Sequence, residues 1–144
     1  MINLVRELHK GFNGNPWHGN NVLSLLRKAN PDTVFTHPIP NAHSLAELAM
    51  HLTAWTEEVT ERIQGNQVKE PEKGDGPTSD EMSRAKWDDL IEAFERANEE
   101  LIRVAGDFTE ENWSMLVTDN RENDEKMLVD YAQLLNGLTQ HHAY

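Results

Sequence analysis

The amino-acid sequence predicts an all-α protein, a four-helix bundle. Apolar residues recur every three or four positions in four stretches, no stretch alternates apolar and polar residues as a strand does, and segments rich in glycine, proline or acidic residues separate the four. The chain has 144 residues, a length at which one hydrophobic core is usual. Each helix would bury its apolar stripe at the centre of the bundle. We therefore expect a single domain over residues 1–144.

The first amphipathic stretch covers residues 2–30 and is interrupted in the middle. Its apolar positions are Ile2, Val5, Leu8 and Phe12 before the interruption, and Val22, Leu25, Leu26 and Ala29 after it. Between them, Gly14 and Pro16 favour a turn or a kink. The pattern predicts one broken helix or two short ones. Residues 31–42 contain three prolines and read as an extended connection.

The second helix has the clearest pattern. Ser44 to Glu47 has the form of a capping box, in which the serine and glutamate side chains each satisfy a backbone N–H of the first turn. Gly65 is a typical end signal for this helix. The predicted inward seam consists of Leu45, Leu48, Leu52, Trp55, Val59 and Ile63.

The last two helices are separated by a polar, acidic segment. Residues 65–79 predict an exposed loop, and a third helix is expected from about Ser79 or Asp80 to Ala105. Residues 107–124 predict a turn, a short extended piece and a loop whose charges face solvent. The final helix is expected to begin near Glu125, with its seam at Leu128, Tyr131, Leu135 and Leu138.

Composition excludes several classes of function. The chain has 13 basic and 25 acidic side chains, and the resulting net charge of −12 would repel nucleic acid and anionic membranes. No apolar run approaches the roughly 18 residues of a membrane span, and the N-terminus lacks a signal-peptide pattern, so a cytoplasmic location is expected. The chain has no cysteine, so any metal must be bound by nitrogen or oxygen.

Two histidines have helical positions that direct them inward. His51 lies three residues after Leu48, beside the seam of its helix. His141 lies three residues after Leu138 and four after Gly137, whose missing side chain leaves space one turn away. Spacing alone leaves two interpretations open: the two imidazoles bind a metal, or they are half-buried and hydrogen-bonded to neighbours.

The remaining polar candidates have simpler explanations. His9, His18, His37 and His43 are interpreted as surface or capping groups. Glu47 either orients the imidazole of a metal ligand as an outer carboxylate or only closes the capping box. Capping is sufficient to explain a glutamate at this position. The sequence has no glycine-rich phosphate loop, no H-E-x-x-H and no G-x-S-x-G turn.

Three segments resemble the DinB/YfiT-like superfamily in order and spacing. They are PWHG at 16–19, HSLAELAMHLTAW at 43–55 and LLNGLTQHHAY at 134–144. The resemblance implies a four-helix bundle, often a homodimer, in which three histidines bind zinc or nickel. Carried onto this chain, two of these ligands are His51 and His141. The third would fall at position 145, beyond Tyr144, so the end of the final helix is expected to be missing from this sequence.

The resemblance also implies a function. It predicts a divalent-metal-dependent enzyme, an S-transferase that uses a low-molecular-weight thiol or a hydrolase, acting on a small-molecule substrate. The adjacent His142 points about 100° around the helix from His141 and is no substitute for the third ligand. The alternative is a non-enzymatic stress-response or binding bundle with an incomplete metal site.

Overall fold

The computed structural model describes residues 3–73, 83–122, 126 and 128–143. This part of the chain forms six helices, which are α1 (Leu4–Asn13), α2 (Val22–Lys28), α3 (Leu45–Ile63), α4 (Arg84–Gly106), α5 (Glu110–Trp113) and α6 (Tyr131–Ala143). Its extended pairing is a single antiparallel bridge between Leu116 and Asp130. None of the helices in the described ranges is long and apolar enough to cross a membrane. The predicted all-α class is confirmed.

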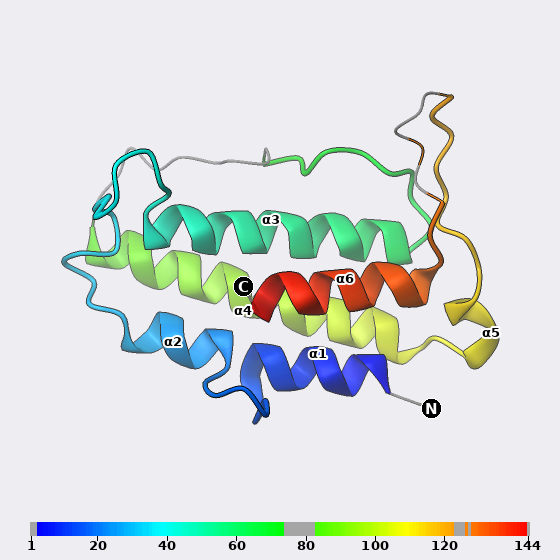
Figure 1. Ribbon diagram of the computed structural model, residues 1–144, viewed down its shortest axis with the longest axis horizontal. Helices are drawn as coiled ribbons and strands as arrows, with labels where there is room; N and C mark the ends of the chain where they lie inside the picture. The colour runs from blue at the N-terminus through cyan, green and yellow to red at the C-terminus, as the bar shows by residue number, and fades with distance from the viewer. Residues whose placement is uncertain (1–2, 74–82, 123–125, 127, 144) are drawn as a thin grey trace.

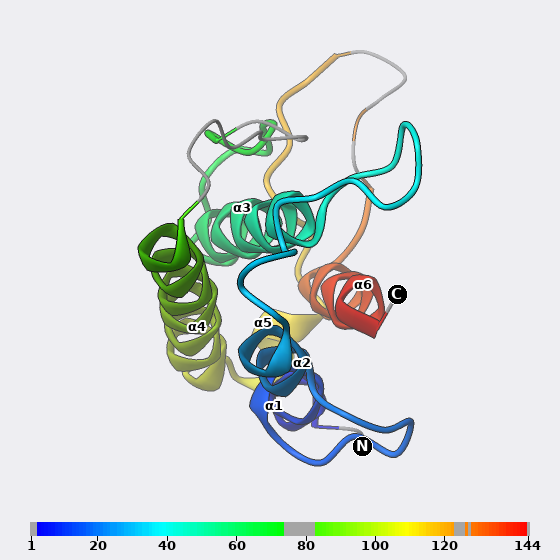
Figure 2. The ribbon, with the colours of Figure 1, turned by 90° about the vertical axis from the view of Figure 1, so that its left-hand side faces the viewer.

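The long helices run side by side around a common core. Figure 1 shows α1 and α2 following one another along one side of the molecule, with α3, α4 and α6 beside them. The end-on view in Figure 2 shows the same helices surrounding the centre, and α6 runs antiparallel to α3. The buried apolar side chains form two clusters, and the partly buried Ile102 packs against both.

The interrupted first stretch forms two separate helices. Asn3 and Asn21 cap them, because each side chain accepts a hydrogen bond from a backbone N–H of the first turn. The Asn21 amide also donates to the Gly14 carbonyl at 2.8 Å, which ties the second helix to the end of the first. The seam position Ile2 lies outside the described residues.

The limits of α3 were predicted correctly, but part of its seam was not. Ser44 and Glu47 form the capping box, and Gly65 follows the helix with a φ of 88°. However, Leu45 and Leu48 are 38% and 44% exposed. The core side of this turn consists of small residues, since Ala46 and Ala49 lie in the same buried cluster as Trp87 and Phe94 of α4. The leucines therefore lie at the edge of the bundle.

The predicted helix starts at Ser79 or Asp80 and at Glu125 lie outside the described residues, in which α4 follows an N-cap at Ser83 and α6 begins at Tyr131. Three features of the second half of the chain differ from prediction. The sequence did not predict α5, which is capped by Thr109 and Asn112. Leu128 precedes α6 and is 72% exposed, so it belongs to no seam. The expectation that all charges in this segment face solvent is wrong for Asp119, whose buried carboxylate accepts hydrogen bonds from Arg121.

Candidate functional site

His51 of α3 and His141 of α6 lie next to each other in the structure. Their Nε2 atoms are 3.2 Å apart and their ring centroids 5.1 Å apart. Both side chains are half-buried. Because the two helices are antiparallel, the second turn of one meets the last turns of the other. The two histidines selected by their helical spacing are thus brought together from positions 90 residues apart.

The distance between the two nitrogens is compatible with both interpretations of the pair. One ring N–H can donate to the other ring nitrogen, or both lone pairs can coordinate one cation. A tetrahedral zinc ion with Zn–N bonds of about 2.05 Å places two ligand nitrogens about 3.3 Å apart. Among the residues that the structure describes, no group of three histidines or carboxylates is arranged to hold a metal ion. The pair therefore fits part of a metal site.

The four histidines that were predicted to be surface or capping groups lie on the surface. His9, His18, His37 and His43 are exposed. His37 Nε2 and His43 Nδ1 lie 3.0 and 3.5 Å from the Glu47 carboxylate. The Ser44 backbone N–H, which donates to the same carboxylate oxygen at 2.8 Å, and then the two histidines lower the pKa of Glu47. These contacts support a capping role for Glu47.

His142 is a buried core residue. Its Nδ1 donates to the Leu138 carbonyl at 2.9 Å, and its Nε2 lies 3.5 Å from the Thr56 hydroxyl. Burial lowers the pKa of His142 to about 4, because the charged imidazolium would lose its hydration. The ring is therefore neutral near pH 7. Its partners on α3 and within α6 agree with its exclusion as a substitute ligand.

Asn98 of α4 is another buried polar residue, and it was not predicted from the sequence. Its side chain is fully buried and its amide donates to the Phe94 carbonyl at 3.0 Å. Its Oδ1 has no hydrogen-bond partner among the described residues. The available signal was its position, four residues after Phe94 and three before Leu101, which places it on the inward stripe of α4.

A pocket of about 490 Å³ opens between α3 and α6 beside the histidine pair. This volume is within the range of small-molecule sites in proteins. Its lining includes both histidines and is otherwise mainly apolar: His51, Trp55, Val59, Arg62, Val129, Gln133, Leu134, Gly137, Leu138 and His141. The Trp55 indole packs edge-on against the His51 ring, with centroids 6.4 Å apart.

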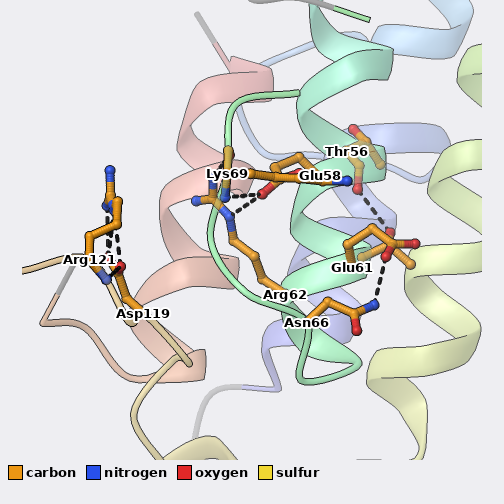
Figure 3. Close-up of polar contacts among 9 residues, drawn as sticks. Thr56, Glu58, Glu61, Arg62, Asn66, Lys69, Asp119 and Arg121 are labelled. Atoms are coloured by element: carbon orange, nitrogen blue, oxygen red, sulfur yellow. Dashed lines mark hydrogen bonds and ion pairs between the residues drawn. The ribbon is translucent and has the colours of Figure 1, made fainter. Parts of the chain in front are cut away.

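A buried ion pair supports the α3 wall of this pocket. Arg62 Nε donates to Glu58 Oε1 at 2.9 Å, and these side chains are only 4% and 1% exposed. The Lys69 backbone N–H donates to the same carboxylate oxygen at 3.1 Å, while Arg62 Nη2 donates to the Lys69 carbonyl at 2.8 Å (Figure 3). The guanidinium lies 5.5 Å from the Trp55 ring centroid. These contacts hold Arg62 against the indole.

The fold and the site together define an α-helical bundle with a histidine pair at one end of an apolar pocket. The chain belongs to the DinB superfamily, whose family model matches residues 17–144. This match covers all three segments on which the resemblance rests, apart from Pro16. Searches of curated proteins and of solved structures found no significant match.

Proposed function

We propose that this protein is a divalent-metal-dependent enzyme that acts on a small molecule, with His51 and His141 as two of the metal ligands. The observation that carries the proposal is the 3.2 Å approach of the two Nε2 atoms at the end of a pocket of about 490 Å³. Membership in the DinB superfamily supports it. The reaction class that we propose is thiol-dependent S-transfer or hydrolysis, located in the cytosol.

A bound zinc or nickel ion would lower the pKa of a coordinated thiol or water. The deprotonated group would then be a nucleophile near neutral pH. The protein's own residues have separate tasks. His51 and His141 would hold the cation through Nε2, and their positions on two packed helices limit how far the rings can move. The apolar lining would cover one side of a bound substrate and lower the polarity around it, which strengthens electrostatic interactions there.

The proposal is tested by metal content. Full-length protein is stripped with chelator, supplied with zinc or with nickel, desalted and measured by elemental mass spectrometry. We expect about one ion per chain in the wild type and a loss of about tenfold or more in His51→Ala and in His141→Ala, since each removes a coordinating nitrogen. His18→Ala is the control, because His18 is exposed and edge-packed on Trp17.

Two outcomes would contradict the proposal. One is a wild-type protein that retains neither metal after loading. The other is a pair of folded alanine variants that retain as much metal as the His18→Ala control. Either result would leave the histidine pair as a hydrogen-bonded element of a metal-free binding bundle.

A further inference from the structure

The residues that line the pocket between α3 and α6 are spread along both helices. Its α3 wall is one helical stripe of four residues, His51, Trp55, Val59 and Arg62. Because α6 is antiparallel to α3, His141 closes the His51 end, and Gln133 lies towards the Arg62 end. At 1.5 Å per residue, His51 and Arg62 are separated by about 16 Å along the helix axis. A ligand can therefore extend well away from the histidine pair.

The middle of the pocket is apolar. It is lined by the Trp55 indole and by the aliphatic side chains of Val59, Leu134 and Leu138. At the far end the positive charge of Arg62 is already compensated by the buried Glu58 carboxylate. The Gln133 side-chain oxygen is likewise engaged, because it accepts from the Asp130 backbone N–H at 3.0 Å. A hydrophilic ligand lying along this surface would lose hydration without gaining matching hydrogen bonds.

We propose that the pocket selects elongated small molecules with an alkyl or aryl body and one metal-binding head group, which lies at the histidine pair. The inference rests on the proposed function, since it names the class of molecule delivered to that metal site. Burial of the apolar body against Trp55, Leu134 and Leu138 provides the selectivity. A compact polar thiol would leave this lining in contact with water.

A larger side chain at Gly137 would block the pocket without replacing either histidine. It lies on the lining one turn before His141, and a Cβ atom built there meets no described atom within 4 Å outside its chain neighbours and its own helix backbone. Gly137→Leu should therefore place its side chain in the pocket. Gly11→Leu is the matched control, because Gly11 also lies in a helix, also has open space around its Cβ, and does not line this pocket.

The test compares 4-phenylbutane-1-thiol with 2-mercaptoethanol, two thiols with the same head group. Their binding to zinc-loaded full-length protein is measured by isothermal titration calorimetry under reducing conditions. We expect the phenyl compound to bind about tenfold or more tightly, and Gly137→Leu to lose about tenfold or more of that affinity while Gly11→Leu keeps it. The inference is overturned if the two thiols bind within about twofold of each other, or if folded Gly137→Leu binds as the wild type does.

Repeating the titration with chelator-treated protein separates the two proposals. If the phenyl compound keeps its Gly137-dependent binding to chelator-treated protein, and the protein retains no zinc after loading, the apolar pocket is supported and the metalloenzyme is not. If zinc is retained but the phenyl compound has no advantage, the selectivity inference fails and the metal site stands. The wild-type comparison of the two thiols decides the inference even if Gly137→Leu does not fold.

Discussion

Replacing Glu58 by alanine is expected to lower the free energy of unfolding by about 3–5 kcal/mol. The Glu58 and Arg62 side chains are almost fully buried and joined at 2.9 Å. Without the carboxylate, the buried guanidinium would lose its 2.9 Å ion pair, which is costly in the interior of a protein. The Lys69 backbone N–H would also lose its 3.1 Å acceptor. Urea denaturation followed by circular dichroism measures the change.

The chain contains a matched control for this prediction. Glu92 and Arg96 of α4 have the same four-residue spacing, but their side chains are 66% and 68% exposed. Glu92→Ala should therefore cost less than about 1 kcal/mol, because solvent screens an exposed pair. If Glu58→Ala is no more destabilising than Glu92→Ala, the ion pair does not support the pocket wall as described.

The second large effect is a loss of stability in mild acid that depends on His142. Its pKa is about 4 in the folded protein, below the usual histidine value of 6.5. The unfolded chain therefore binds the proton more readily between these two values. The contribution of neutral His142 to the free energy of unfolding is complete above pH 6.5 and is lost as the pH falls towards 4. For one site with these pKa values, linkage gives a loss of about 2 kcal/mol between pH 7 and pH 5.

His142→Leu is the variant that tests this effect. Leucine has a similar volume and no titratable group, so the variant should lose about 2 kcal/mol less than the wild type between pH 7 and pH 5. Both proteins are denatured with urea at the two pH values in the presence of chelator, so that metal binding does not contribute. Equal losses in the two proteins would show that His142 does not carry the acid sensitivity.

Much of the fold could be predicted because its signals are local. The capping box at Ser44 and the stop at Gly65 depend on residues within one turn of each helix end. The inward seam of α3 was harder, because Leu45 and Leu48 have the same spacing as buried leucines. Their exposure depends on α4, which packs against the neighbouring small residues Ala46 and Ala49.

The histidines of the candidate site could be predicted from the sequence, whereas the wall of its pocket could not. His51 and His141 each lie beside an apolar seam, so helical spacing alone selected them. Glu58 and Arg62 have the spacing of an ordinary surface pair. Their burial arises because residues after Gly65 return along α3, so that Lys69 contacts both side chains. This return is a tertiary contact that periodicity does not encode.

His51 and His141 are proposed to bind one divalent metal ion between them. Diffraction data from zinc-loaded crystals, collected above the zinc absorption edge, test this claim most directly. We expect an anomalous peak about 2 Å from the Nε2 atoms of both His51 and His141. An ordered histidine pair in direct hydrogen-bond contact, with no anomalous peak beside it, would show that the pair binds no metal.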